Sequence, residues 1–479
     1  MHNDEKIHFI GVGGASMSAL AKFAKMQGMQ VTGSDRTQSA ITKELEKLFP
    51  IFYGEHPEIV DDCHKVVYSS AISCDNLEMK RAKELGIPTV ERCDFLGQIA
   101  DGFQKTIAIA GAHGKTTATA MIAHGLKTLG KSFSAHIGGE TEYGNLILEG
   151  NEFFVTEACE YKKSLLSLNP YISLLLNVEL DHPDCYKDMK SLLQVFLTFL
   201  SRAEIKVFPT KFIDICQDEH MLLYEYESTL SQLEQVKENG NLKENSFVVL
   251  SNGNVDIWSA NLDDDISKEL KVLKNGISPM SVILPNNHMM TVLNGLAVVA
   301  VLSTIGCDEK EIENCLANFK GVKRRNEYIG RLGKAKVVFD YAHHPTQIAG
   351  IISAYKGKNL VVFQPHTYTR TKAYFDDFVG ALSLADRLVI LDTYGARENK
   401  IQGADSIDLV RAISTKCAQS RVEYVKRDDK TIEYVKIHKN DYDNILFLGA
   451  GDIYLIKDKL MGELDDVFSI EVQDVMKVF

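Results

Sequence analysis

Short apolar segments alternate with amphipathic, helix-like segments along almost the whole chain. The first segment, KIHFI at 6–10, is followed by an amphipathic stretch at 15–27 and by a second apolar segment at 30–35. The alternation starts again with TIAIAGAHGKTT at 106–117, and once more after GVKRRNEYIG at 321–330. This pattern is typical of α/β folds with mostly parallel sheets. We therefore expect three successive α/β units.

The two restarts give the predicted domain bounds. A chain of 479 residues is too long for one core, and about two to four domains are expected at this size. We place the domains at 1–103, 104–325 and 326–479. Within the second, the pattern predicts a strand at 172–177 and a helix at 291–305.

Composition and charge narrow the class of protein. The net charge is −12, from 53 basic and 65 acidic side chains, and no Lys/Arg-dense face is apparent, so we expect no nucleic-acid partner. The nine cysteines have no paired spacing, which favours a reducing compartment over a disulfide framework. The most apolar window, at 172–178, is far shorter than the roughly 20 residues of a membrane span. We expect a cytoplasmic protein without membrane insertion.

The stretch GAHGKTT follows a predicted strand and precedes a helical segment, which is the context of a phosphate-binding loop. The loop is shortened, because Ile109 stands five residues before Gly114, where the usual pattern has glycine. Backbone N–H groups of 111–115 and the helix N-terminus would hold anionic oxygens. Lys115, as a loop lysine of little importance to packing, would reach the terminal phosphates, and Thr116 would bind magnesium. The alternative is an ordinary glycine-containing turn.

A second glycine-rich turn, GVGGASM at 11–17, is a weaker signal. It is similar to a dinucleotide fingerprint, but Ser16 occupies the third glycine position. Asp35 ends the next strand, where a ribose-binding carboxylate would lie. From these residues alone, a nicotinamide site, another nucleotide site and a merely tight turn all remain open.

Acidic residues follow two strands of the central unit, in VTEACEYKKS and LLLNVELDHPDCY. They are Glu157, Glu160, Glu179 and Asp181, accompanied by His182. Ligands are expected at the carboxyl ends of parallel strands, so Glu157 and His182 would converge on the metal held by Thr116. Oxygen ligands with a single imidazole suit magnesium or manganese. For His182, the alternative is a surface ion pair.

The third unit places polar residues after its strands, in FDYAHHPTQIAG and VVFQPHTYTRTK. They are Asp340, His343, His344, His366 and Arg370. No Cys or H-E-x-x-H partner supports a zinc site, and a polar cleft over a nucleotide and a small charged substrate fits better. FLGAGDIY, at the last strand, has no charged partner after it and is interpreted as structural.

The ordered set GAHGKTT, EACEYKKSLLSLNP, NVELDHPD, DYAHHPT and QPHTYTRT resembles the motifs of the Mur ligases of peptidoglycan synthesis. The resemblance covers nearly the whole chain and is weakest across 206–282. It implies three domains: a Rossmann-like N-terminal domain that holds a UDP-sugar, a central P-loop ATPase domain, and a Rossmann-like C-terminal domain on the amino-acid side. It also implies a monomer or weak homodimer.

The start GVGGASMSALA and the segment YSSAI resemble the members that join L-alanine to UDP-N-acetylmuramate. The implied cofactors are ATP and Mg2+, with Mn2+ as the alternative metal. The implied reaction converts a carboxylate to an acyl phosphate, which an amine then attacks. Lys115 and the metal would neutralise developing charge, and His343 would take the proton of the amine.

The resemblance also assigns site residues by position. The implied ATP-binding residues, with Asn294 at the adenine and Asp340 at the ribose, are Gly111, Ala112, His113, Gly114, Lys115, Thr116, Thr117, Asn294, Arg325 and Asp340. The implied substrate-binding residues are Gly13, Gly14, Ser70, His343, His366 and Arg370. The implied metal ligands are Thr116, Glu157 and His182. The implied catalytic residues are Lys115, His343 and Arg370.

Four positions depart from the common motifs of that family. Ala112 replaces a threonine, which is minor because the backbone binds the phosphate. EACEYK replaces EADESD, so the role of Glu160 is open, and PNNHMMTVLN leaves His288 unassigned. Thr367 replaces an arginine and removes one contact for a substrate carboxylate.

Two other functions remain open from the sequence. One is a related ligase that adds a recycled peptide or another amino acid to UDP-N-acetylmuramate; the chain length and the compact QPHTYTRT region favour the free amino acid. The other is a nucleotide-dependent binding or regulatory protein without catalysis. The intact set of Lys115, Thr116, Glu157 and His182 argues against that reading.

Overall fold

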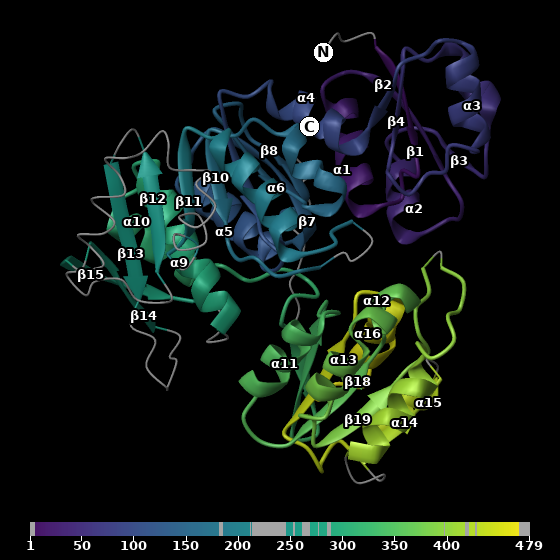
Figure 1. Ribbon diagram of the computed structural model, residues 1–479, viewed down its shortest axis with the longest axis vertical. Helices are drawn as coiled ribbons and strands as arrows, with labels where there is room; N and C mark the ends of the chain where they lie inside the picture. The colour runs from purple at the N-terminus through teal and green to yellow at the C-terminus, as the bar shows by residue number, and fades with distance from the viewer. Residues whose placement is uncertain are drawn as a thin grey trace.

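The computed structural model describes residues 5–181, 185–210, 212, 246–251, 254–260, 269–275, 277–284, 289–396, 398–416, 421–426 and 429–468. Three sheets organise these residues into three lobes (Figure 1). The N-terminal lobe is purple, the central lobe runs from blue to teal, and the C-terminal lobe is green to yellow. The expected α/β class is therefore confirmed.

The N-terminal sheet has five parallel strands in the order β3-β2-β1-β4-β5. Its strands are β1 (Lys6–Ile10), β2 (Gln30–Asp35), β3 (Ile51–Tyr53), β4 (Lys65–Tyr68) and β5 (Thr89–Glu91). Its helices are α1 (Ala15–Met26), α2 (Ala40–Glu46), α3 (Leu77–Glu84) and α4 (Arg92–Ala100), with a 3₁₀ turn at Pro57–Asp62. The strand order reverses beside β1, so the turns after β1 and β4 meet at the edge where α/β sheets bind ligands.

The central sheet has ten strands in the order β15-β14-β13-β12-β11-β10-β6-β9-β7-β8. The parallel strands are β6 (Lys105–Ala110), β7 (Phe133–Thr141), β9 (Phe153–Glu157), β10 (Ile172–Leu175) and β11 (Ile205–Pro209). The antiparallel strands are β8 (Gly144–Leu148), β12 (Phe247–Ser251), β13 (Asn254–Ala260), β14 (Glu269–Lys274) and β15 (Ile277–Ile283). The helices are α5 (Lys115–Thr128), α6 (Met189–Ser201), α9 (Met289–Thr304) and α10 (Glu309–Ala317), with a 3₁₀ segment at Tyr161–Ser167.

The expectation of mostly parallel sheets fails at both edges of the central sheet. At one edge β8 pairs antiparallel with β7, and at the other β12 to β15 form a meander of antiparallel strands. Two residues separate β12 from β13, and two separate β14 from β15. Such short connections permit hairpins but not the crossover that parallel strands require. The predicted helix at 291–305 is α9.

The C-terminal sheet has seven strands in the order β20-β19-β18-β21-β17-β16-β22. They are β16 (Glu327–Leu332), β17 (Ala335–Asp340), β18 (Asn359–Phe363), β19 (Arg387–Ile390), β20 (Val422–Tyr424), β21 (Asn444–Leu448) and β22 (Asp466–Val467). Among these strands only β16 runs against the others, and it pairs antiparallel with both β17 and β22. The helices are α11 (Pro345–Ala354), α12 (Tyr368–Ala373), α13 (Phe375–Leu382), α14 (Ser406–Lys416), α15 (Asp429–Ile437) and α16 (Leu455–Met461), with a 3₁₀ turn at Asp452–Tyr454.

The first two lobes share one continuous apolar core. It joins Phe9 and Phe95 of the N-terminal lobe to Phe154 and Phe196 of the central lobe. Phe103, in the connection between the lobes, stacks on Phe154 with ring centroids 4.8 Å apart. Each fully buried side chain of this kind contributes about 1.5–3 kcal/mol. The C-terminal sheet instead has separate cores on its two faces.

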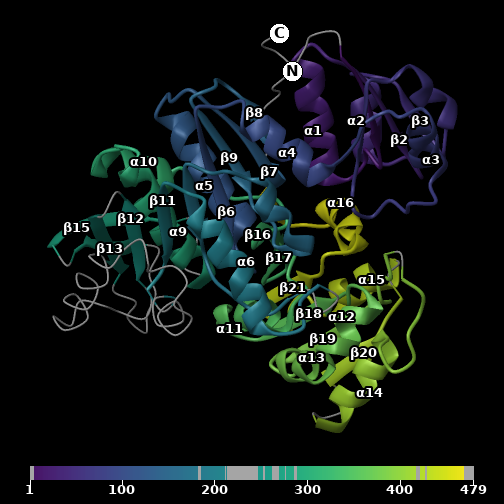
Figure 2. The same cartoon turned by 45° about the horizontal axis from the view of Figure 1, so that its top comes forward.

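A polar contact surface accompanies this core. Helix α1 packs against β7 and β8 of the central lobe, as Figure 2 shows.

In the described part of the chain, no helix combines the length and apolar character needed to cross a membrane.

Candidate active site

The phosphate loop connects β6 to α5 through two glycines with positive φ. Gly111 has a φ of 135° and Gly114 a φ of 88°, conformations that glycine adopts without the steric cost other residues incur. A Cβ on Gly114 would lie 2.5 Å from Oδ1 of Asn294, so the α9 side chain closes directly over the turn. Lys115, Thr116 and Thr117 form the first turn of α5. The loop therefore ends at a helix N-terminus, which favours anions.

Asn177 holds the loop backbone from the segment after β10. The backbone N–H of His113 donates to Oδ1 of Asn177 at 2.9 Å, and Nδ2 of Asn177 donates to the carbonyl of His113 at 2.8 Å. The sequence did not predict a role for this residue. Its only signal was an asparagine directly after an apolar strand.

Lys115 forms a buried ion pair with Glu160. Its ammonium lies 2.9 Å from Oε2 of Glu160 and also donates to the carbonyls of Gly111 and Ala112. Only 14% of the lysine side chain and 3% of the glutamate side chain are exposed. Burial lowers the pKa of Lys115, but the charge and hydrogen bond of Glu160, with Cys159 and Glu157, together outweigh it and the net pKa is raised. The lysine is therefore cationic and pre-oriented under the loop.

Thr116 and Glu157 lie against neighbouring glycines of β7. A Cβ on Gly138 would be 2.4 Å from Oε1 of Glu157, and a Cβ on Gly139 would be 2.8 Å from Cγ2 of Thr116. The two glycines thus allow both side chains to lie directly against the backbone of β7. Their oxygens are donors of the kind that magnesium prefers. Arg325 also donates to the Thr116 hydroxyl, at 3.2 Å.

Two histidines named in the sequence analysis, His182 and His288, lie outside the described residues.

The first glycine turn is closed by its own neighbours. The backbone N–H of Gly13 donates to Oδ2 of Asp35 at 2.8 Å, and Gly14 is the N-cap of α1. Asp35 therefore stabilises the turn. Ser70, on the segment after β4, accepts a hydrogen bond at its carbonyl from Nζ of Lys162, at 3.2 Å. This contact joins the turn region to the central lobe.

Ser16 connects α1 to the central lobe. Its hydroxyl lies 2.9 Å from Nε2 of His136 and 3.2 Å from Nη1 of Arg92. Burial first, and then the charge of Arg92, lowers the pKa of His136 to about 3. The residue that breaks the dinucleotide fingerprint is thus used for contact between lobes.

In the C-terminal lobe, three predicted residues meet beside the central lobe. Nδ1 of His343 donates to the carbonyl of Tyr341 at 2.9 Å, which leaves the lone pair on Nε2. The rings of His343 and His366 are 5.9 Å apart, and Arg370 lies 3.4 Å from His366. Burial and then Arg370 lower the pKa of His343, and they lower the pKa of His366 to about 4. Arg370 pairs across the lobes with Asp181 at 3.2 Å.

Asp340 fixes the connection into the C-terminal lobe. Its carboxylate accepts from the backbone N–H of Asn326 at 2.5 Å and from that of Ala342 at 2.6 Å. Burial raises its pKa, against the opposing charge of Arg325. Arg324 and Asn326 have φ values of 64° and 47°, so the connection is strained on both sides of Arg325.

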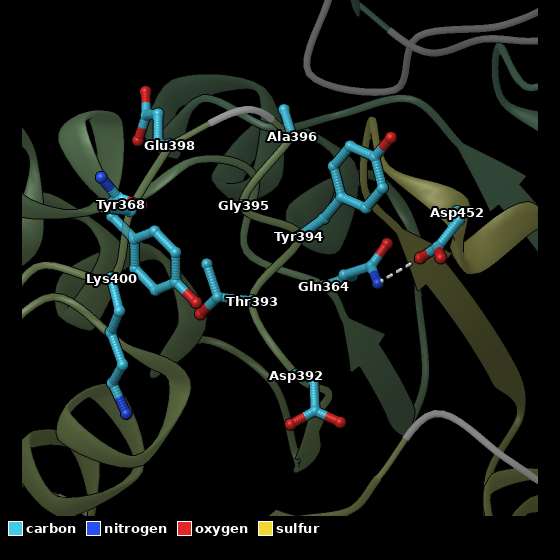
Figure 3. Close-up of a pocket in the computed structure, with 11 residues that line it drawn as sticks. Gln364, Tyr368, Asp392, Thr393, Tyr394, Gly395, Ala396, Glu398, Lys400 and Asp452 are labelled. Carbon is cyan, nitrogen blue, oxygen red and sulfur yellow. Dashed lines mark hydrogen bonds between the residues drawn. The ribbon is translucent and has the colours of Figure 1, made fainter. Parts of the chain in front are cut away.

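A polar cavity of about 450 Å³ opens at the carboxyl ends of β18, β19 and β21 (Figure 3). The strand order reverses between β18 and β21, the position where such sheets bind ligands. Gln364 and Asp452 lie side by side in its lining, and Nε2 of Gln364 donates to Oδ1 of Asp452 at 2.7 Å (Figure 3). Tyr394 lines it and stacks on His366 at 5.6 Å, so the cavity adjoins the histidine cluster. The turn FLGAGDIY needs its glycine for packing, because a Cβ on Gly451 would lie 2.5 Å from Oε1 of Gln364. The next residue of the same turn, Asp452, lines the cavity.

Three family models match successive parts of the chain. They are the Mur ligase family catalytic domain at 6–104, the Mur ligase middle domain at 109–302, and the Mur ligase glutamate ligase domain at 324–451. The chain is 35% identical to the UDP-N-acetylmuramate–L-alanine ligase of Clostridium beijerinckii, over 96% of this chain and 98% of that protein. It is also 35% identical to the ligase of the same name from Acetivibrio thermocellus, over 95% and 96% of the two chains.

Solved structures show the same arrangement of domains. The UDP-N-acetylmuramate–alanine ligase of Thermotoga maritima matches with a TM-score of 0.75 at 25% identity, over 95% of this chain and 98% of that chain. A murein peptide ligase from Psychrobacter arcticus matches with a TM-score of 0.64 at 20% identity, over 97% and 100%, which is a likeness of fold. The models and relatives together cover nearly the whole length, and the chain belongs to the Mur ligase family.

Proposed function

We propose that this protein joins L-alanine to the lactyl carboxylate of UDP-N-acetylmuramate in the cytoplasm, with ATP as co-substrate. The products are UDP-N-acetylmuramoyl-L-alanine, ADP and phosphate, and the step belongs to the synthesis of peptidoglycan precursors. The names of the relatives that match over nearly the full length support this substrate pair. The structural observation that carries the proposal is one junction between lobes, where Arg325 contacts Thr116 and Arg370 contacts Asp181.

The phosphate loop and its surroundings are proposed to bind ATP. The backbone of 111–117 holds the phosphates, Asn294 lies on the adenine side, and Arg325 and Asp340 border the ribose. Both carboxylate oxygens of Asp340 already accept backbone hydrogen bonds, so a ribose hydroxyl would use their second lone pairs. We expect the ammonium group of Lys115 to leave Glu160 and bind a phosphate oxygen when ATP binds. Before that, Glu160 keeps this ammonium group directed into the loop.

Magnesium, with manganese as the alternative, is proposed to bind at Thr116, Glu157 and His182. The hydroxyl of Thr116 and the carboxylate of Glu157 suit a hard cation, and the paired glycines of β7 leave room beside them. When bound, the ion neutralises charge on the oxygens of the transferred phosphoryl group. Lys115 contributes a second positive charge from the protein itself.

The C-terminal lobe is proposed to carry the amine chemistry. His343 is neutral near pH 7, because burial and Arg370 lower its pKa. Its Nε2 lone pair can therefore accept a proton from the amino group of the incoming amino acid, whose nitrogen lone pair attacks the acyl phosphate and releases phosphate. His366 and Arg370 border the reacting carboxylate, and Arg370 is oriented by Asp181 until substrate arrives. Closure of this lobe on the central one would exclude water from the acyl phosphate.

The nucleotide-sugar is proposed to bind in the first domain, at Gly13, Gly14 and Ser70. We also propose the domain bounds 1–103, 104–325 and 326–479. They are supported by the sheets, because the strands of each sheet lie within one of these segments.

Phosphate release measures the proposed reaction directly. With ATP, magnesium and UDP-N-acetylmuramate, release is expected with L-alanine, and mass spectrometry should find the UDP-N-acetylmuramoyl-L-alanine product. Omission of any one component should abolish release. Release with a recycled peptide but not with L-alanine would assign the alternative ligase. Nucleotide binding without turnover on any acceptor would assign a binding protein.

A further inference from the structure

His113 of the phosphate loop belongs to a hydrogen-bonded chain of four side chains from two lobes. Nε2 of Gln347, in the first turn of α11, lies 2.7 Å from Nδ1 of His113. Nε2 of His113 lies 2.7 Å from Oε2 of Glu179, in the segment after β10. The other oxygen of Glu179 accepts from the hydroxyl of Thr346, which neighbours Gln347. The C-terminal lobe thus contacts His113 directly at one ring nitrogen, and at the other through Glu179.

The direction of each hydrogen bond follows from Gln347. Its Oε1 accepts the backbone N–H groups of His343, at 3.1 Å, and His344, at 3.3 Å. The NH₂ group therefore faces His113 and donates to Nδ1. In the neutral ring the proton then lies on Nε2, where it is donated to Glu179. Each of the three hydrogen bonds in the chain thus pairs a donor with an acceptor.

This direction argues against a metal ion at the same place. His113, Glu179 and His344 offer three ligand atoms within 4.8 Å of one another, a spacing that a divalent cation can bridge. A metal at Nε2 of His113 would need a lone pair there. The donor from Gln347 places the lone pair at Nδ1 instead. The geometry favours hydrogen bonding.

The phosphate loop is consequently held at two levels. Asn177 fixes the backbone of His113 from within the central lobe, whatever the position of the C-terminal lobe. The side chain of His113 is held by Glu179 of the central lobe at Nε2 and by Gln347 of α11 at Nδ1. Thr346, also in α11, donates to Glu179. Undocking of the C-terminal lobe therefore removes one hydrogen-bond partner of His113 and one of Glu179.

We propose that Gln347 and Glu179 are positioning residues that couple docking of the C-terminal lobe to nucleotide binding through His113. The coupling is reciprocal: ATP in the loop favours the docked lobe by the factor by which docking favours ATP. The proposal rests on the ATP-binding role given above, but it does not need the ligation reaction. Nucleotide binding and docking can be measured without acceptor substrates.

The test compares three variants of the full chain. Gln347→Ala removes both the donor to His113 and the helix-capping acceptor. Gln347→Glu keeps the capping oxygen and removes only the donor. Ser353→Ala, an exposed position on the same helix, is the matched control. ATP affinity is measured by calorimetry without nucleotide-sugar, and docking by energy transfer between labels at exposed Gln194 on α6 and exposed Arg411 on α14.

In Gln347→Ala we expect about 10-fold weaker ATP binding and a smaller ATP-induced change in energy transfer, with Ser353→Ala like wild type. In Gln347→Glu, the ring of His113 must take a second proton to bridge two carboxylates. His344, whose pKa is lowered by burial, and Glu179 also face it. ATP binding by that variant should therefore approach wild type at acidic pH and weaken as pH rises.

Two results would overturn the proposal. The first is unchanged ATP affinity and unchanged energy transfer in Gln347→Ala. The second is stoichiometric Zn2+ binding that His344→Ala abolishes, which would make the cluster a metal site. Absence of ligase activity, with the ATP and docking effects intact, would count against the proposed reaction and leave the coupling established.

Discussion

Replacement of Lys115 by alanine should destabilise the protein as well as inactivate it. From the sequence, Lys115 is a loop lysine of little importance to packing, and its loss would leave the fold intact. In the structure its ammonium pairs with Glu160, whose side chain is 3% exposed. The variant leaves a buried carboxylate without its cation.

The size of the effect follows from this burial. Breaking a buried ion pair by removing one partner costs about 3–5 kcal/mol, because the remaining charge is uncompensated. Lys115 and Glu160 lie in the first two lobes, which share a core; for such a unit of about 325 residues each kcal/mol lowers Tm by about 1.5 °C. The Tm of Lys115→Ala should therefore fall by about 4–8 °C. The double variant Lys115→Ala, Glu160→Gln removes the charge and should recover most of the loss.

Thermal unfolding of wild type, Lys115→Ala, Glu160→Gln and the double variant gives the coupling energy between Lys115 and Glu160. We expect a coupling energy of about 1.5–3 kcal/mol. Phosphate release should fall at least about 100-fold in both variants that lack the lysine, because a charge-stabilising contact is lost. Recovery of stability without recovery of activity separates the two roles. A Tm for Lys115→Ala within about 2 °C of wild type would refute the buried pair, and more than a tenth of wild-type turnover would refute the phosphate-loop role.

Three further outcomes are expected. Calorimetry should detect binding of UDP-N-acetylmuramate to the first domain, but no binding of NAD or NADP, because Ser16 replaces the third glycine of the dinucleotide fingerprint and contacts His136. Micromolar affinity for NAD without affinity for the UDP-sugar would reverse the assignment. Glu157→Gln should raise the magnesium concentration for half-maximal activity about 10-fold or more, and an unchanged requirement would remove Glu157 from the metal site. The pKa of His136 is about 3 in the folded protein and about 6.5 in the unfolded chain, so as pH drops the unfolded chain takes up the proton first. The free energy of unfolding should therefore fall as pH drops from about 6.5 towards 3. In denaturant titrations His136→Asn should make this fall less steep, and an equally steep fall would exclude His136 as its source.

Local patterns were sufficient for much of the fold and for part of the site. The strand-turn-helix at Gly111–Lys115 and the alternation of elements depend on neighbouring residues, and the structure has them where they were expected. The antiparallel strands β12 to β15 lie where the resemblance was weakest, and short apolar segments do not reveal their pairing direction.

Contacts between residues far apart in the chain could not be predicted from the sequence. Asn177 lies 64 positions from His113, and Gln347 lies 234 positions from it. No periodicity along the chain links such pairs, because the lobes that bring them together are arranged by tertiary packing. The burial of Lys115 was hidden for the same reason, since it depends on Glu160 returning from another strand end.

The apolar core shared by the first two lobes bears on how the chain unfolds. Phe95 and Phe154 lie in one cluster, so separating the lobes would expose both sides of it to water. The cores of the C-terminal sheet contain only residues of its own lobe. The protein should therefore unfold as two cooperative units and not three. Calorimetry should resolve one thermal transition for the first two lobes together and another for the C-terminal lobe. A chain cut after residue 103 should yield fragments that aggregate, whereas a fragment that begins at 326 should fold alone.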